Sequence, residues 1–263
     1  MPHPSIARRI PWLLVAVSVL AASGCAHRPV TSSEAGRWTQ AQQLVLVTSA
    51  DWNTDHGTLR RFERDGAGWR AIGDAQPVTI GRAGSAWGLG LNDARDDGPV
   101  KREGDGRSPA GVFEIGEAFG YGATASTALP YAPMQASDYC VDVSGSPLYN
   151  RIVDTNDVGV DAIKGATEPM RRDLHADGDQ RYRLGFVIEH NRQQAPMGGS
   201  CIFAHLWKSP SDPTTGCTAM DSTTMDALVG WLRPDRNPIF VLLPVPAYTK
   251  LRAAWALPTI DGR

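Results

Sequence analysis

Short β-type runs separated by glycine- and proline-rich turns dominate the chain after its first 43 residues. The 27 glycines and 19 prolines leave few stretches that favour a long helix. Residues Tyr182–Asn191 alternate apolar and polar side chains and are β-branched at their centre, which is typical of a strand. Ile239–Leu243 is an apolar run closed by Pro244, which predicts a buried strand. The sequence therefore predicts a mainly β fold with a few short helices.

Further strands are expected near the start of this region. Leu44–Thr48 is a short β-type run that should open the fold. Thr58–Arg64 and Trp69–Ile72 flank Asp65-Gly66, a pair that supplies the positive φ angles of a tight hairpin turn. Pro77–Gly81 predicts another strand. We interpret Leu44 to Pro246 as one β-rich domain because no repeat or composition break divides it.

A helix is expected after the β-type runs. Its start is capped by Asp221 or Ser222, and Pro234 ends it. Gly116–Thr127 is expected to be a long loop, and Asp154–Gln180 a flap or an irregular connection. The apolar positions of the helix fall at i, i+3, i+4 and i+7, and they are Met225, Leu228, Val229 and Leu232.

The first residues resemble an export signal. Arg8 and Arg9 precede a short apolar core, Ile10–Leu20, which is too short for a comfortable membrane span. Ala21–Cys25 resembles the cleavage box of a bacterial lipoprotein, so residues 1–24 are predicted to be the signal peptide and Cys25 the lipidated residue. An ordinary signal peptide cleaved near Ala26 is the alternative.

Four segments follow from this interpretation. They are the signal peptide, a lipidated tether over residues 25–43, the folded domain over 44–247 and a C-terminal tail over 248–263. Export and lipidation predict a periplasmic protein of a Gram-negative bacterium, with its lipid anchor in the outer membrane.

Charge and motif content exclude several classes of protein. The net charge of −2, without a run of Lys or Arg, argues against a nucleic-acid partner. No HExxH or CxxC motif is present, and His56, His175 and Asp177 lack the spacing of a metal site, so no metal is expected.

A histidine and a cysteine close together in the sequence suggest thiol chemistry. His205 lies in the apolar run Ile202–Trp207, and Cys217 follows 12 positions later. A neighbouring imidazole lowers the pKa of a thiol and carries its proton. Gly216 lets the backbone turn sharply, so that N–H groups could face an oxyanion. The alternative is a buried structural cysteine and a core histidine.

The remaining cysteines suggest a disulfide. Export implies an oxidising compartment, where structural bridges persist. Cys140 and Cys201 are the preferred pair, because Cys217 lies in the motif that needs a free thiol. Unpaired structural thiols at Cys140 and Cys201 are the alternative.

At three places the chain resembles the L,D-transpeptidase catalytic domain (YkuD type) of bacterial cell-wall enzymes. Gly104–Phe113 resembles the family segment Gly-Asp-Gly-Arg-Thr-Pro-x-Gly-x-Phe. Ile202–His205 resembles the family's histidine strand, and Thr214–Cys217 its Ser-x-Gly-Cys turn. The resemblance spans roughly Leu44 to Pro246, and the order of the three segments makes it specific.

The resemblance implies a β-sandwich or barrel, no cofactor and no metal. It implies that Cys217 is the nucleophile and His205 the general base and acid, with the backbone of Thr215 and Gly216 forming the oxyanion site. The reaction would exchange a peptide bond between peptidoglycan stem peptides through a thioester, which is a transferase activity in cell-wall biogenesis and cell shape.

The chain departs from the family pattern at Ala219, where members commonly have arginine. This departure predicts a divergent subgroup. Two other functions stay open, an L,D-carboxypeptidase or amide hydrolase on the same stems, and a cell-wall-binding lipoprotein without activity.

Five further residues are candidates for substrate contacts. His190 competes with His205 as the base, and Asn191 could orient it. Thr214 could hydrogen-bond the turn or the base. Arg107 could bind a stem carboxylate in a bidentate fork, and Trp207 could line a groove two residues from His205. Structural roles in capping, packing or surface charge are the alternative for each.

Overall fold

The computed structural model describes residues 1–2 and 34–260. The predicted signal peptide, the lipidation of Cys25 and the first part of the tether lie outside these residues. Within the described ranges, no helix is long and apolar enough to cross a membrane.

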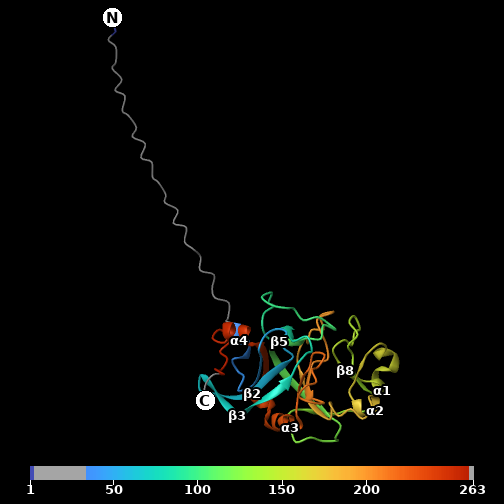
Figure 1. The fold of residues 1–263 in the computed structure, drawn as a ribbon. Helices are drawn as coiled ribbons and strands as arrows, with labels where there is room; N and C mark the ends of the chain where they lie inside the picture. Colours follow the sequence, from blue (N-terminus) through green and yellow to red (C-terminus); the bar gives the residue numbers. More distant parts are fainter. Residues whose placement is uncertain (3–33, 261–263) are drawn as a thin grey trace. The chain divides into compact units, whose positions relative to one another are not determined.

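The centre of the fold is a large mixed sheet whose pairings close on themselves (Figure 1). The order is β10-β11-β12-β3-β2-β1-β13-β5, and β5 pairs again with β10, so the fold is mainly β, as the sequence predicts. Two short strands, β4 and β6, add to β5. The strands are β1 (Gln43–Ser49), β2 (His56–Asp65), β3 (Gly68–Thr79), β4 (Ser85–Trp87), β5 (Ser108–Gly120), β6 (Tyr131–Pro133), β10 (Leu184–Ile188), β11 (Phe203–Leu206), β12 (Thr218–Met220) and β13 (Ile239–Pro244).

Most of the predicted strands are present, and two boundaries differ. The β2–β3 hairpin turns at Gly66 with a φ of 55°, as the Asp-Gly signal predicts. Residues 77–79 continue β3 rather than forming a separate strand. The predicted loop Gly116–Thr127 is wrong in its first part, because β5 continues to Gly120 and pairs there with β10 and β6.

The core lies between this sheet and α3 (Ser222–Trp231). β1 and β13 run parallel, and every residue of both strands is buried. Asp221 caps α3 by accepting a hydrogen bond from the backbone N–H of Thr224 at 3.0 Å, which confirms the predicted helix start. The four apolar positions of the predicted helix face are buried, and they are Met225, Leu228, Val229 and Leu232.

Parts of residues 34–43 and of residues 248–260 belong to the core, so the predicted tether and tail are wrong in part. A 3-10 helix spans Glu34–Trp38, and Trp38 packs edge-on against Trp255 with ring centroids 5.4 Å apart. The Trp38 indole also donates to the Trp255 carbonyl at 3.2 Å. α4 (Val245–Leu251) precedes Trp255, which is 1% exposed. Two indoles bury too much apolar surface to lie in a solvated tether or tail.

Residues 138–179, which we call the cap, contain a separate three-stranded sheet, β8-β7-β9. Figure 1 shows its labelled elements β8, α1 and α2 gathered together in the yellow part of the chain. A disulfide joins Cys140 of the cap to Cys201, just before β11. The cap contains β7 (Asp138–Cys140), β8 (Ile152–Asp154), α1 (Thr155–Val158), a 3-10 helix (Val160–Ile163), β9 (Glu168–Pro169) and α2 (Arg172–His175).

Candidate active site

Hydrogen bonds from two hydroxyl groups hold the turn that carries Cys217. Thr214 Oγ1 donates to the carbonyl of Cys217 at 2.7 Å and accepts from the backbone N–H of Gly216 at 3.1 Å. Ser108 Oγ, on β5, donates to the same carbonyl at 2.9 Å and accepts from the N–H of Gly81. The turn is therefore fixed to two distant parts of the sheet, and Thr214 acts on the turn rather than on a base.

The sulfur of Cys217 is buried and bonded to backbone groups. The N–H of Phe203 donates to Sγ at 3.3 Å, and the thiol donates to the carbonyl of Cys201 at 3.5 Å. Burial, together with the negative charge of Glu168, raises the pKa of the Cys217 thiol to about 12. The resting side chain is thus a neutral thiol. It is the free cysteine of the described residues, since Cys140 and Cys201 form the bridge that the sequence favoured.

His205 lies on β11, and Cys217 directly precedes the neighbouring strand β12. Phe203 and His205 are two positions apart on β11, so their side chains point to one face. His205 Nδ1 donates to the carbonyl of Leu206 at 2.8 Å, which leaves Nε2 as the acceptor nitrogen.

No hydrogen bond joins His205 to Cys217 within residues 34–260. Burial lowers the pKa of His205 to about 4, so the imidazole is neutral. Its ring packs edge-on against Tyr182 with centroids 5.1 Å apart. The two residues of the predicted pair therefore lie on adjacent segments of the sheet, without a hydrogen bond between them.

A cavity of about 230 Å³ opens beside Cys217. The turn residues Thr215 and Gly216 line it together with Glu168 of the cap and the cations Lys101 and Arg82. Lys101 is paired with Asp105 at 2.6 Å. The cavity thus holds a thiol, backbone groups of the turn and charges of both signs.

One part of the predicted oxyanion site is wrong. The N–H of Gly216 donates to Thr214 Oγ1 inside the turn, so it does not point to a ligand. The Ser/Thr-type side chain of position 214 competes for that group, which is a common event in tight turns. The backbone amides of Thr215 and Cys217 stay the candidates for an oxyanion.

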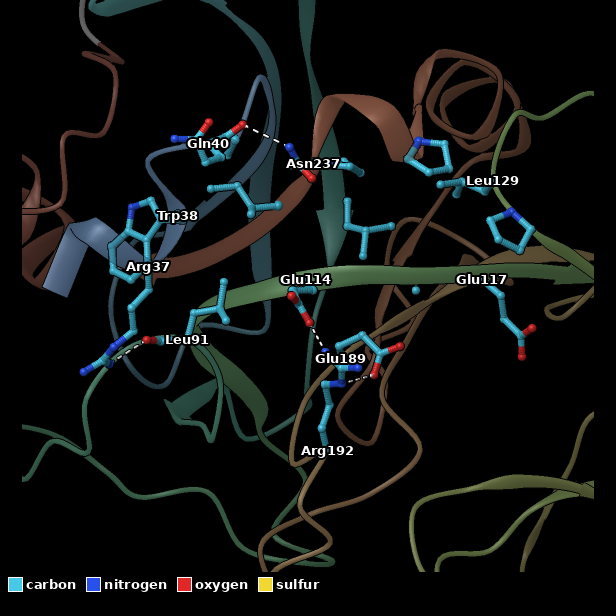
Figure 2. Close-up of a pocket in the computed structure, with 17 residues that line it drawn as sticks. Arg37, Trp38, Gln40, Leu91, Glu114, Glu117, Leu129, Glu189, Arg192 and Asn237 are labelled. Carbon is cyan, nitrogen blue, oxygen red and sulfur yellow. Dashed lines mark hydrogen bonds and ion pairs between the residues drawn. The ribbon is translucent and has the colours of Figure 1, made fainter.

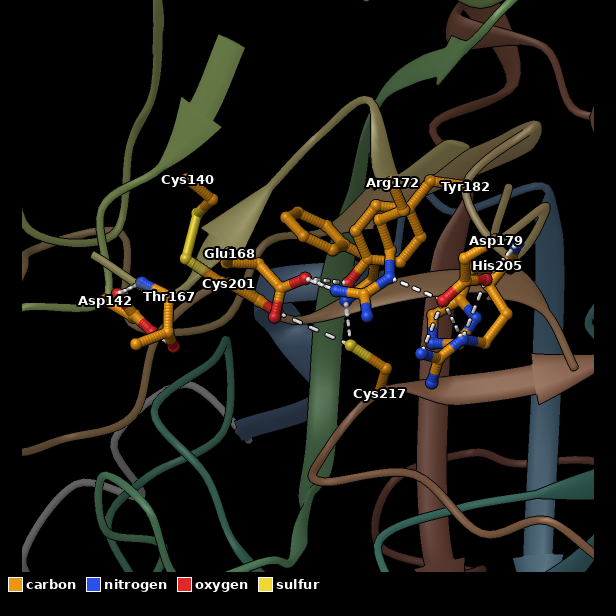
Figure 3. Close-up of polar contacts among 12 residues, drawn as sticks. Cys140, Asp142, Thr167, Glu168, Arg172, Asp179, Tyr182, Cys201, His205 and Cys217 are labelled. Carbon is orange, nitrogen blue, oxygen red and sulfur yellow. Dashed lines mark hydrogen bonds and ion pairs between the residues drawn. A yellow bond between two sulfur atoms is a disulfide. The ribbon is translucent and has the colours of Figure 1, made fainter. Parts of the chain in front are cut away.

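Glu168 and Tyr182 are site residues that the sequence reasoning missed. Tyr182 donates to Glu168 Oε1 at 2.8 Å, and Arg172 donates to the same oxygen at 3.0 Å (Figure 3). Tyr182 and Cys217 belong to one buried cluster. Burial raises the pKa of Glu168. No local sequence motif identifies these residues, because β9 and the segment before β10 come together only when the cap has folded.

Two of the remaining candidates, His190 and Asn191, have structural contacts. His190 Nδ1 accepts from the N–H of Leu89 at 3.2 Å, and Nε2 donates to the carbonyl of Gly198 at 2.9 Å. Burial lowers the pKa of His190 to about 4. Asn191 donates to the carbonyls of Ala195 and Gly199, both at 3.0 Å. Neither side chain reaches His205 or Cys217 through a hydrogen bond within residues 34–260.

Arg107 and Trp207 lie outside the Cys217 cavity. The Arg107 guanidinium donates to the carbonyls of Trp52 and Ser85 at 2.8 and 3.0 Å. It therefore stabilises loops and is not free to bind a carboxylate in a bidentate fork. Trp207 is half-buried directly after β11, and its backbone N–H donates to the carbonyl of Met220.

A larger cavity of about 490 Å³ lies elsewhere, beside Trp38 and β5 (Figure 2). Glu114, Glu117 and Glu189 line it, and Arg192 forms ion pairs with Glu114 and Glu189. Burial raises the pKa of Glu117 and of Glu189. Neither Cys217 nor His205 lines this cavity, so the chemistry of the thiol belongs to the smaller one.

Comparison with known proteins adds little. No family model and no curated protein matches this chain. The solved structure of Bdellovibrio bacteriovorus Bd1075 is similar to it with a TM-score of 0.37 and 15% sequence identity. The match covers 77% of this chain and 48% of that one, so this chain spans about half the length of that protein. A likeness at this level carries no argument about function.

Proposed function

We propose that this protein is a cysteine acyltransferase of the cell wall, an L,D-transpeptidase that cross-links peptidoglycan stem peptides. The observation that carries the proposal is the position of Cys217. It is a free thiol on a glycine turn fixed by Ser108 and Thr214, and it lines a cavity with charges of both signs. The three sequence segments that resemble the L,D-transpeptidase family support the choice of substrate.

In this proposal Cys217 attacks the amide carbonyl that follows the diamino acid of a donor stem. His205 Nε2 takes the thiol proton and returns it to the leaving D-amino acid. A C–S bond forms and the C–N bond breaks, giving a thioester. An amine of a neighbouring stem then attacks the thioester and regenerates the thiol, so no ATP is needed. An amide donor to the oxyanion would stabilise the transition state by about 3 kcal/mol.

Strand pairing supports a role for His205 together with Cys217. His205 lies on β11, and Cys217 directly precedes β12, which pairs in parallel with β11. The N–H of Phe203, two residues before His205 on the same strand, donates to the Cys217 sulfur at 3.3 Å. The hydrogen bond from Nδ1 to Leu206 fixes the tautomer that presents Nε2 as the base.

The test is an incubation of purified protein with disaccharide tetrapeptides, followed by mass spectrometry. We expect cross-linked dimers and released D-amino acid with the native protein, and neither with Cys217→Ala. Cys217→Ser is the matched variant that keeps the size of the side chain and loses the thiol. Full turnover by Cys217→Ala would overturn the mechanism.

Other outcomes identify the alternatives. Shortened monomers without dimers would mean that water is the acceptor, which makes the protein an L,D-carboxypeptidase or amide hydrolase. Binding of the tetrapeptides without any product would mean a cell-wall-binding protein.

We also propose that the protein is exported and anchored by lipid at Cys25, in the outer membrane of a Gram-negative cell. The residues involved lie outside the described structure. Metabolic labelling with an alkyne fatty acid tests this. We expect label on the native chain and none on Cys25→Ala, and equal labelling of the two would contradict it.

A further inference from the structure

Charged side chains from several segments line the cavity beside Cys217, and they are Arg82, Lys101, Glu103, Asp142 and Glu168. Two of them are held by residues near the cavity. Lys101 donates to Asp105 at 2.6 Å, and Ser200 donates to Glu103 at 2.6 Å. The charges of Lys101 and Glu103 are therefore already used inside the protein.

The two carboxylates that the cap contributes are also held. The backbone N–H of Thr167 donates to Asp142 at 2.9 Å. Arg172 and Tyr182 donate to Glu168 at 3.0 and 2.8 Å (Figure 3). Within residues 34–260, neither carboxylate forms an ion pair with a cation that lines the cavity.

Arg82 is the remaining charge, and it has no partner. Within residues 34–260, its guanidinium forms no hydrogen bond, ion pair or ring contact. The side chain is exposed to solvent. Exposed arginines are common on protein surfaces, and the way in which the protein holds Arg82 distinguishes it from them.

The backbone of Arg82 is fixed to the turn that carries Cys217. Its N–H donates to the carbonyl of Thr214 at 2.8 Å, and the N–H of Thr214 donates to the carbonyl of Ile80 at 2.8 Å. Gly81 forms an isolated β-bridge with Thr214. The main chain at Arg82 is therefore held in one position relative to the thiol.

Gly106 provides a surface for the side chain of Arg82. A Cβ atom at Gly106 would lie 3.3 Å from both Cγ and Nε of Arg82, and the φ of Gly106 is 70°. The aliphatic stem of Arg82 thus lies across a residue without a side chain, and that residue lines the same cavity. Packing of the stem restricts its rotamers, so less entropy is lost when the guanidinium binds a ligand.

A guanidinium that is free in this way is suited to a carboxylate. It can donate two parallel N–H bonds to the two carboxylate oxygens, and such charge-assisted pairs are stronger than neutral hydrogen bonds. Under the proposed function, the leaving D-amino acid of the donor stem carries a terminal carboxylate. A diamino dicarboxylic acid in the stem carries a second one on its side chain. Both lie close to the bond that Cys217 attacks.

We propose that Arg82 is the carboxylate-binding residue of this cavity and holds a carboxylate of the donor stem beside the Cys217 thiol. The inference deepens the proposed function and rests on it for the identity of the ligand. Arg82 is then a specificity-determining residue, because a donor with a carboxamide in place of that carboxylate loses the paired hydrogen bonds.

The first test compares alkylation of Cys217 by iodoacetate, which carries a carboxylate, with alkylation by the neutral iodoacetamide. Mass spectrometry of the peptide that contains Cys217 gives both rates, and their ratio cancels the intrinsic reactivity of the thiol. We expect Arg82→Gln to lower the ratio of the iodoacetate rate to the iodoacetamide rate about fivefold. Arg82→Lys keeps the charge without the fork and should lower it about twofold. A ratio that Arg82→Gln leaves unchanged would overturn the proposal.

Arg252→Gln is the matched control. Arg252 follows α4 and does not line the Cys217 cavity, and its guanidinium has no hydrogen bond or ion pair within residues 34–260. At about 0.15 M salt, exposed charges more than about 8 Å apart are largely screened, so this variant should keep the native ratio. An equal decrease in Arg82→Gln and Arg252→Gln would mean an effect of net charge, and it would also overturn the proposal.

The second test measures binding of disaccharide tetrapeptides to Cys217→Ala by calorimetry, which excludes turnover through the thiol. Adding Arg82→Gln should weaken binding about fivefold. Two further peptides carry a carboxamide, one at the C-terminus and one on the side chain of the diamino acid. The peptide whose affinity no longer depends on Arg82 lacks the carboxylate that Arg82 binds. Equal affinities with and without Arg82→Gln for all three peptides, or an equal loss for all three, would overturn the proposal.

The tests fail separately from the proposed function. A preference for iodoacetate that depends on Arg82, without turnover of tetrapeptides by the native protein, would keep the carboxylate site and remove the transpeptidase. Cross-linked dimers formed at equal kcat/KM by the native protein and by Arg82→Gln would keep the transpeptidase and remove the role of Arg82.

Discussion

The backbone N–H of Phe203 donates to the sulfur of Cys217 at 3.3 Å. This contact ties the strand that carries His205 to the turn that carries the thiol. A donor at this distance favours the thiolate over the thiol, so it opposes the effect of burial on the thiol pKa. The sheet itself therefore supplies part of the stabilisation that a cysteine nucleophile needs.

Removing the hydroxyl of Ser108 or of Thr214, which hold the turn that carries Cys217, should disturb the thiol. We expect Ser108→Ala and Thr214→Val each to lower the free energy of unfolding by about 1–2 kcal/mol, since each leaves the buried carbonyl of Cys217 with one donor fewer. Both should also change the alkylation rate of Cys217. Thr127→Val, which removes a comparable bond to the carbonyl of Val229 at 2.9 Å, should cost similar stability without altering that rate. Urea unfolding and alkylation kinetics measure the two effects.

A side chain at Gly81 should displace the same turn. A Cβ atom there would lie 2.4 Å from the carbonyl oxygen of Gly106 and 2.7 Å from the N–H nitrogen of Ser108. We expect Gly81→Ala to lower the free energy of unfolding by about 2–4 kcal/mol, because backbone atoms must move. Gly68→Ala is the control, with its nearest contact at 3.7 Å. Equal stability of the two variants would show that Gly81 is not tightly packed against residues 106–108.

Loss of the Cys140–Cys201 bridge should destabilise the cap and the site together. The bridge joins residues 61 positions apart. Opening a loop of this length costs about 4 kcal/mol in the chain-entropy model. We expect this loss for the double variant Cys140→Ala/Cys201→Ala in urea unfolding. Cys217→Ala keeps the bridge and should lose much less, and a double variant as stable as the native protein would contradict the prediction.

The two buried histidines should make the protein sensitive to acid. Burial lowers the pKa of both His190 and His205 to about 4, below the unfolded value of 6.5. A depressed pKa contributes stability that is present above pH 6.5 and is lost as the pH falls through 4. Each histidine should contribute about 3 kcal/mol at neutral pH.

Urea unfolding between pH 7 and pH 4 measures this loss. His205→Gln should reduce the slope of stability against pH, because one buried titrating group is gone. His56→Gln is the control, since Asp55 raises the pKa of His56 and its side chain is about half exposed. A slope that His205→Gln leaves unchanged would mean that the imidazole is not buried in solution.

Local patterns were sufficient for much of the fold. The alternation in Tyr182–Asn191 and the apolar run before Pro244 predict strands that the structure contains as β10 and β13. The Asp65-Gly66 hairpin and the Asp221 helix cap depend on neighbouring residues only, so the sequence reveals them. The position of His205 on an apolar strand and of Cys217 on a glycine turn could also be predicted from local residues.

Long-range contacts account for what the sequence did not reveal. Trp38 and Trp255 are 217 positions apart, and their contacts with each other and with Trp87 place parts of the predicted tether and tail in the core. Glu168 lies in a polar segment without periodicity, and its approach to Tyr182 depends on the disulfide and on the pairing of β9 with β7. A pattern of neighbouring residues cannot predict that a carboxylate from a distant segment lies at the site.

The disulfide also has a consequence for how the protein matures. Three sulfurs in residues 34–260 permit three pairings, and the native one joins Cys140 to Cys201. Each of the other two uses Cys217, so a wrongly oxidised chain lacks both the native bridge and the free thiol. Under the proposed function, a thiol–disulfide isomerase that restores the Cys140–Cys201 pair would therefore restore activity as well as the fold.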